Sequence, residues 1–159
     1  MNSIEQRLAE LGFTLPESPT PRANYVPYRV VGNLLFIAGQ IPTADGQDKF
    51  VGKVGHDLTV EDGQRAAQLC ALNMLSQVRT ALGGSFDRLI SCVRLGGFVN
   101  CHPDFGQQPQ VINGASDLIV HALGDAGRHT RFAVGAISLP RNVAVEIDGM
   151  FEVKPSLGL

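Results

Sequence analysis

Short apolar runs rich in β-branched and aromatic residues predict several β-strands. Residues 26–31 (VPYRVV) and 34–38 (LLFIA) are separated only by Gly32 and Asn33, a pair typical of a tight hairpin turn. These two runs are therefore expected to form an antiparallel hairpin. Further strands are expected at residues 49–53, 88–99, 131–137 and 143–153.

Two longer segments repeat apolar residues every three to four positions, as α-helices do. The first begins after Thr59, which can cap the helix together with Asp62, and continues to about Leu82. Its apolar face comprises Ala67, Cys70, Ala71, Met74, Val78 and Leu82. The second is expected from about Pro109, which suits a first helical turn, to Leu123. The predicted order of the main body is βββαβαββ.

A third, shorter helix is expected near the N-terminus. Ser3 can cap it, Gly12 can end it, and Ile4, Leu8 and Leu11 lie on one stripe. We expect this helix to be a small amphipathic appendage to the main body.

The segment that follows this helix predicts the domain organisation. Residues 15–25 (LPESPTPRANY) are rich in Pro, Ser and Asn, which favours an irregular tether. The length of 159 residues matches the commonest size of one domain. We therefore expect an N-terminal helix and Pro-rich tether at residues 1–24 and a single α+β domain at residues 25–159.

The faces of the predicted strands indicate an assembly. In residues 34–38, and mostly in residues 88–99, both faces of the strand are apolar, which is typical of strands covered on both sides. Two long helices can cover only one face of such a sheet. A second copy of the chain is the simplest cover for the other face, so a homo-oligomer is predicted.

Composition narrows the possible partners. Thirteen Lys and Arg residues are scattered against fifteen Asp and Glu, giving a net charge of -2, so no basic surface for a nucleic acid is predicted. No apolar run approaches the roughly 18 residues of a membrane span. Because the first residues also lack the features of a signal peptide, we expect a cytoplasmic protein without a membrane partner.

The sequence contains no pattern typical of a metal or cofactor site. Cys70, Cys92 and Cys101 lack CxxC spacing, and the four histidines have no i,i+4 partner. A glycine-rich phosphate loop, HExxH and GxSxG are also missing from the sequence. We therefore expect reduced thiols, no metal and no cofactor.

Two charged residues within predicted strands are the best candidates for chemistry. Arg131 begins one strand, and Glu146 lies inside another, where a central position would bury it at least partly. Two structural explanations are open on pattern alone. One is an ion pair between adjacent antiparallel strands, and the other is a Glu146 that faces solvent with Asp148 and Glu152.

Two motifs then suggest a family. The stretch LLFIAGQIP at residues 34–42, together with R-x-x-V-x-x-x-x-L-P-x-x-x-x-V-E-I from Arg131 to Ile147, resembles the RidA (YjgF-like) family, also called L-PSP endoribonucleases. The resemblance extends over about residues 25–154. It implies a chorismate-mutase-like α+β fold with a mixed sheet and two long helices on one face. It also implies a trimer whose sheets pack into a central barrel, with pockets between subunits.

The resemblance further implies an activity and a set of site residues. The family hydrolyses reactive imines or enamines of 2-amino acids to 2-keto acids and ammonia. By position, Arg131 would hold the substrate carboxylate and Glu146 would orient or activate water. Asn113 and Tyr28 occupy positions of pocket residues, and Gly39 a position where the backbone approaches the ligand.

The chain departs from the commonest family pattern at several positions. Ala38 stands where the family often has Ser, and Ala133 where it often has a thiol. Residues 127–130 (GRHT) also differ, which leaves the roles of Arg128 and His129 open. These departures indicate a divergent branch whose substrate side chain the sequence does not identify.

Two alternative functions are open. The chain could be a non-enzymatic binder or sensor of small carboxylate metabolites, with Arg131 as the anchor in the same cleft. The endoribonuclease activity in the older family name has the least support, because no basic stripe is present to neutralise phosphates.

Overall fold

The computed structural model describes residues 3–18 and 23–155. The main sheet has five strands in the order β1-β2-β7-β5-β6. These are β1 (Tyr28–Val31), β2 (Leu34–Gln40), β5 (Leu89–Asn100), β6 (Thr130–Ala136) and β7 (Val145–Val153). Neighbouring strands are antiparallel except β5 and β6, which are parallel. The sheet is therefore mixed, as the family resemblance implies.

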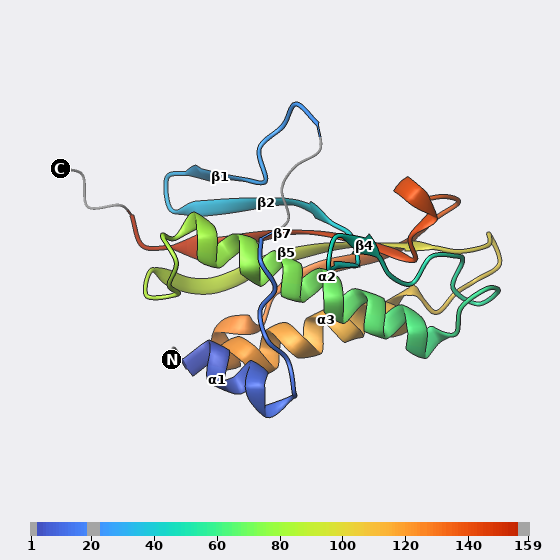
Figure 1. Cartoon of the computed structure of the whole chain (residues 1–159), viewed down its shortest axis with the longest axis horizontal. Coiled ribbons are helices and arrows are strands. Elements are labelled where there is room, and N and C mark those ends of the chain that lie inside the picture. Colours follow the sequence, from blue (N-terminus) through green and yellow to red (C-terminus); the bar gives the residue numbers. More distant parts are fainter. Residues whose placement is uncertain (1–2, 19–22, 156–159) are drawn as a thin grey trace.

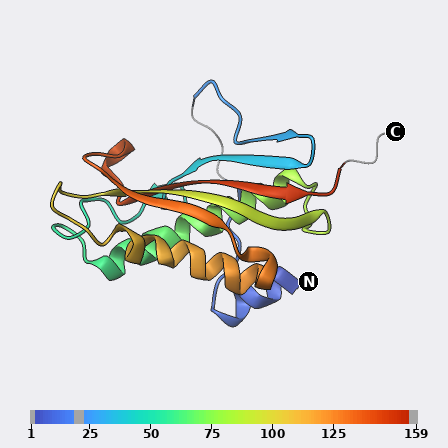
Figure 2. The same cartoon turned by 180° about the vertical axis from the view of Figure 1, so that it is seen from behind.

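Helices α2 (Val60–Ala81) and α3 (Gln108–Leu123) cover one face of the sheet (Figures 1 and 2). Thr59 and Asp62 form the predicted capping box, with the Asp62 amide donating to Thr59 Oγ1 at 3.0 Å. The whole predicted apolar face of α2 is buried. The α+β class with two long helices on one side is thus confirmed.

The two helices approach each other closely at Gly114 of α3. A Cβ at this position would lie 2.2 Å from the backbone oxygen of Gln64 in α2, so only glycine fits there. On its other side α3 packs against β5, where Ile112 lies over Gly97. A Cβ at position 97 would lie only 2.7 Å from Ile112 Cδ1. This packing fixes α3 beside the sheet edge.

The strand predicted at residues 49–53 does not form. The structure instead has a small hairpin of β3 (Thr43–Ala44) and β4 (Gln47–Asp48), and Val51 makes only an isolated bridge. Phe50 has φ 52° and Gly52 has φ 131°, and both angles are incompatible with an extended strand. The prediction was therefore wrong because backbone conformation interrupts the apolar run.

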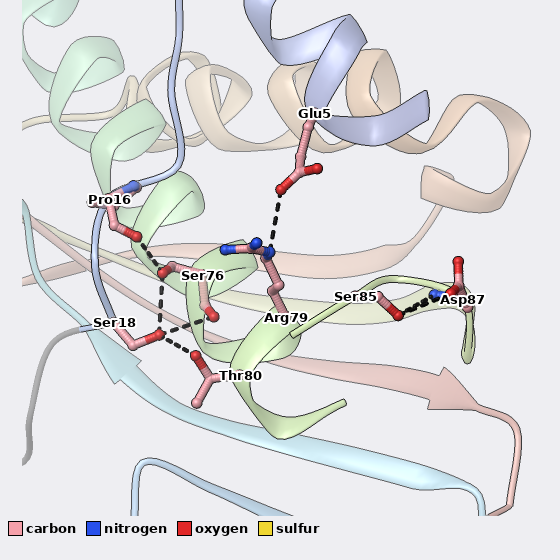
Figure 3. A network of polar contacts seen from close by, with 8 residues as sticks. All are labelled: Glu5, Pro16, Ser18, Ser76, Arg79, Thr80, Ser85 and Asp87. Carbon is pink, nitrogen blue, oxygen red and sulfur yellow. Dashed lines mark hydrogen bonds and ion pairs between the residues drawn. The ribbon is translucent and has the colours of Figure 1, made fainter. Parts of the chain in front are cut away.

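Helix α1 (Ser3–Glu10) packs against the main body and is not an appendage. Ile4 and Leu8 are buried in the hydrophobic core, whereas Leu11, predicted on the same stripe, is 45% exposed. Glu5 also forms an ion pair with Arg79 of α2 at 3.2 Å (Figure 3). The sequence-based prediction of an appendage was wrong for this helix.

The segment after α1 is held on α2 by a polar network (Figure 3). Ser18 Oγ lies 3.1 Å from Ser76 Oγ and 2.5 Å from Thr80 Oγ1, and Ser76 Oγ donates to the Pro16 carbonyl at 2.5 Å. Residues 19–22 of the predicted tether lie outside the described residues. Residues 16–18 therefore form a fixed strap across α2.

The face of the sheet opposite the helices carries exposed apolar side chains. Phe36, Phe98 and Val134 are each about 40% exposed, and Val31 is 56% exposed. Phe98 and Phe132 stack edge to face with ring centroids 5.3 Å apart. Because strands β1, β2, β5 and β6 all contribute to it, this patch has the character of an interaction surface.

The packing of α1 leads to a stability prediction. Leu8→Ala should lower the free energy of unfolding by about 2–5 kcal/mol, because the side chain is only 1% exposed and its loss leaves a cavity. Leu11→Ala, the matched control in the same helix, should cost under about 1 kcal/mol. Urea denaturation measures both. Equal, small effects would show that α1 contributes little to the core.

Candidate functional site

Glu146 and Gly39 come together where the pairing of β2 with β7 changes register. The ladder shifts by one residue between Ile37 and Gln40, so β2 bulges there. Gln40 Nε2 donates to the Ala38 carbonyl at 2.9 Å inside the bulge. A Cβ on residue 39 would lie 2.3 Å from Glu146 Oε1, so this carboxylate lies directly over bare glycine backbone.

A cleft of about 920 Å³ opens beside this pair. Its walls come from the bulge, the β3–β4 turn, α2, the strap and the connector before β7. The lining residues are Pro16, Glu17, Ser18, Tyr25, Pro27, Ala38, Gly39, Gln40, Ile41, Thr43, Ala44, Asp45, Gly46, Asn73, Gln77, Pro140, Arg141 and Glu146. The cleft is therefore large enough for a small-molecule ligand.

The environment of Glu146 favours its protonated form. The side chain is half-buried, and this burial is the main cause that raises the pKa of the carboxyl group above its usual value of 4.5. The negative charge of Asp148 on the same strand raises the pKa further. A carboxyl group with a raised pKa inside a cleft is suited to proton transfer.

The cysteines are poor candidates for nucleophiles. Burial raises the pKa of Cys70 well above its ordinary value, and the charge of Glu146 adds to this. Burial also raises the pKa of Cys92 to about 12. All three cysteines are free and buried. Thiolate chemistry at Cys70 and Cys92 is therefore disfavoured near neutral pH.

Arg131 lies at the other edge of the sheet, against α3. Its Nη1 donates to Ser116 Oγ at 2.9 Å, and its Nη2 donates to Asn113 Oδ1 at 2.9 Å and to the Pro109 carbonyl at 3.3 Å. The structure thus brings two of the predicted site residues, Arg131 and Asn113, into direct contact. Sequence reasoning missed Ser116, whose spacing of three residues from Asn113 places both on one side of α3.

Arg131 and Glu146 do not meet within one chain. Strand β5 lies between β6 and β7, with Leu95 opposite Arg131 and Phe98 opposite Glu146. Two strand spacings and three residues along β5 separate their Cα atoms by roughly 14 Å. The alternative of an ion pair between adjacent strands is therefore wrong. Glu146 instead shares its face of β7 with Asp148 and Glu152, as the second alternative expected.

The structure does not place Tyr28 in the cleft. Tyr28 is partly buried and packs against the hydrophobic core, whereas Tyr25 and Pro27 line the cleft. The Ala38 amide donates to the Pro27 carbonyl at 3.0 Å, which ties this segment to the bulge. Tyr25 is thus the tyrosine that could face a ligand, and its position at the end of the irregular segment 15–25 gave no periodic signal.

The described residues contain neither a metal site nor a membrane span. Within residues 3–18 and 23–155, no group of three His, Cys, Asp or Glu side chains could hold a metal ion. No helix in the same ranges combines the length and apolar character needed to cross a bilayer. A second, smaller hollow of about 350 Å³ is lined by Cys101 and His102, beyond the C-terminal end of β6.

Comparison with known proteins identifies the family. The model of the family described as "YjgF/chorismate_mutase-like, putative endoribonuclease" matches residues 5–151. The chain belongs to this family. Because the YjgF family match begins at residue 5, helix α1 is part of the family pattern and not an addition to it, contrary to the sequence-based expectation.

Individual relatives agree with this assignment. Protein TCP17 of Trypanosoma cruzi is 44% identical over 151 residues, which is 94% of each chain. The crystal structure of Atu1372, a protein of unknown function from Agrobacterium tumefaciens, has 50% identity and a TM-score of 0.91, covering 96% of this chain and 93% of that one. The crystal structure of a protein named "a putative endoribonuclease" from Shewanella oneidensis MR-1 has 35% identity and a TM-score of 0.90, covering 95% of this chain and 99% of that one.

The raised pKa of Glu146 predicts how stability depends on pH. At pH values between 4.5 and the raised folded-state pKa, the folded protein binds more protons than the unfolded chain, so stability falls as pH rises through this window. Glu146→Gln removes the cost of charging a half-buried group. The variant should therefore unfold at a higher temperature than the wild type at pH 7.5, and the difference should shrink below pH 4.5. Thermal denaturation across this range would contradict the account if the variant were less stable at every pH.

Proposed function

We propose that this protein hydrolyses imines or enamines of 2-amino acids to 2-keto acids and ammonia, at a site completed by a second subunit of a homotrimer. One subunit contributes Glu146 and Gly39, and its neighbour contributes Arg131 and Asn113. The observation that carries the proposal is the half-buried Glu146 carboxyl group, which lies over bare Gly39 backbone in a cleft. The motif resemblance assigns the same two positions to the reacting end of the substrate.

The separation of Arg131 from Glu146 supports a site between subunits. In a 2-imino acid the reacting carbon is bonded directly to the carboxylate carbon. A residue that binds the carboxylate must therefore lie within a few ångströms of the one that acts on water. Within one chain β5 lies between them, and their partners on β5, Leu95 and Phe98, are three residues apart and so point to opposite faces of the sheet. A neighbouring subunit can bring the second group to the cleft.

The uncovered sheet face supports the trimer. Phe36, Phe98 and Val134 form an apolar patch opposite the helices. Packing this face against other copies would bury the patch and place sheet edges of neighbouring subunits side by side. A homotrimer built this way would bring β6 of one subunit to the Glu146 cleft of the next.

Arg131 is suited to bind the substrate carboxylate. Its hydrogen bonds occupy one Nη1 proton and both Nη2 protons, and the longest of them, at 3.3 Å, goes to the Pro109 carbonyl. A carboxylate that displaces this carbonyl gains the paired N–H groups of Nε and Nη2. Such a two-pronged contact fixes the orientation of the substrate as well as its position.

Glu146 is suited to move the protons of the reaction. Water adds its oxygen to C2 of the N-protonated imine while the Glu146 carboxylate accepts one of the water protons, which leaves a neutral carbinolamine. Glu146 returns this proton to the nitrogen, the C2–N bond breaks as ammonia leaves, and the hydroxyl proton passes to the Glu146 carboxylate as the C2–O bond becomes the keto group. Burial raises the pKa of Glu146, which suits a carboxyl group that both accepts and returns a proton.

The proposal predicts the effect of one substitution. Glu146→Gln should retain binding of 2-oxobutyrate, because the amide nearly preserves the shape of the cleft, but should lower kcat by about 10²–10⁴-fold, because it cannot relay a proton. An assay that generates imines in situ from several amino acids, and follows the keto acid formed, measures this loss.

Glu152→Gln is the matched control for this experiment, because Glu152 lies on the same face of β7 but outside the cleft lining. Its kcat should stay within about twofold of the wild type, as for a distant surface position. Unchanged turnover in Glu146→Gln would remove the hydrolysis mechanism. Binding of 2-oxobutyrate without any turnover by the wild type would favour the binder or sensor.

A further inference from the structure

His129 lies within hydrogen-bonding distance of two neighbours. Its Nδ1 lies 2.6 Å from the Gly127 carbonyl, and its Nε2 lies 2.9 Å from Ser116 Oγ. The ring is partly buried between the end of α3 and the start of β6. Its two hydrogen bonds therefore orient it from both sides.

The donors and acceptors in this chain of contacts are determined by the groups themselves. A carbonyl only accepts, so His129 Nδ1 carries the proton, and Nε2 of the neutral ring is an acceptor. Ser116 must then donate its hydroxyl proton to His129. Arg131 only donates, so the lone pairs of Ser116 Oγ face the guanidinium and accept from its Nη1 at 2.9 Å.

This directional chain fixes one side of the Arg131 guanidinium. Ser116 holds Nη1 and Asn113 holds Nη2, so the guanidinium keeps one orientation. The edge formed by Nε and Nη2 is then the one that a ligand can bind once it displaces the Pro109 carbonyl. Without His129, the Ser116 hydroxyl would lose its acceptor, and its side chain would be free to rotate Oγ away from Arg131. The contact between Ser116 and Arg131 would then be lost or weakened.

We propose that His129 is a positioning residue for Arg131 and acts through Ser116. The inference gives a role to the GRHT stretch at residues 127–130, which departs from the commonest family pattern. It rests on the proposed function, because it assumes that Arg131 binds the substrate carboxylate. Its effect is on the orientation of that anchor and not on the proton transfer at Glu146.

The test compares four variants by titration calorimetry with 2-oxobutyrate and by imine hydrolysis. His129→Leu and Ser116→Ala should each raise Kd and KM about five- to tenfold while kcat stays within about twofold, because an anchor acts equally in ground and transition states. His129→Gln should restore most of the affinity, since its amide oxygen can accept from Ser116. The double variant Ser116→Ala/His129→Leu should be no worse than either single change, because both interrupt one chain of contacts.

His121→Leu is the matched control, since His121 lies on α3, the helix that carries Ser116, but its imidazole contacts the Arg7 carbonyl and Glu10 instead. Its Kd should equal that of the wild type. Unchanged Kd in a folded His129→Leu protein, or multiplying effects in the double variant, would overturn the inference. If His129→Leu does not fold, the Kd values of Ser116→Ala and His129→Gln test the inference instead. A raised Kd in Ser116→Ala with a nearly native Kd in His129→Gln supports it, and an unchanged Kd in Ser116→Ala overturns it.

Crystal structures of the wild type and His129→Leu separate this inference from the proposed function. If the wild type neither binds 2-oxobutyrate nor hydrolyses imines, the proposed function fails. The positioning role is then supported if the Arg131–Ser116 contact is broken in His129→Leu. It is overturned if Arg131 keeps its place.

Discussion

The position of β5 between β6 and β7 is the constraint on which the proposed chemistry depends. It places Arg131 and Glu146 on strands that cannot touch, although the two residues are only 15 positions apart in the chain. Within one subunit, each charged group therefore has surroundings that do not include the other. Arg131 binds acceptors on α3, and Glu146 lies over Gly39 with a raised pKa. Neither arrangement needs the other group for folding.

The same sheet explains why assembly and catalysis are linked in this proposal. Two helices are enough to cover only one face, and the other face exposes Phe36, Phe98 and Val134. Contact between copies of this face would bury apolar area and at the same time bring the two half-sites together. The half-burial of Glu146 then has a functional consequence: it costs stability at neutral pH and provides a proton carrier in the cleft.

Features determined by local sequence were predictable. The hairpin at Gly32 and Asn33 and the capping box of Thr59 and Asp62 each depend on residues at most three positions apart, and both occur as predicted. The resemblance correctly indicated the family and its mixed sheet. Contacts between distant segments were less accessible, because no local pattern states which strands pair or where an amphipathic helix packs.

The error at α1 follows from the same limit, whereas the error at residues 49–53 is one of local backbone conformation. Leu8 lies in a pattern typical of a surface helix, yet α1 packs on the core. The apolar run around Val51 lacks the extended backbone of a strand, because Phe50 has a positive φ. For the site, the motif suggested Arg131 and Glu146, but it could not show that β5 lies between the strands that carry them. Ser116 and Tyr25 became candidates only once α3 and the cleft were placed in space.

Subunit complementation tests the central claim, a site shared between subunits, most directly. Arg131→Ala and Glu146→Gln proteins, each inactive alone, are denatured together in equal amounts and refolded. A shared site in a randomly mixed trimer takes Arg131 from one subunit and Glu146 from another, so about a quarter of all sites regain both native residues, and roughly that fraction of wild-type imine hydrolysis should return. If the site lay within one subunit, no mixture would regain activity, and this result would contradict the account.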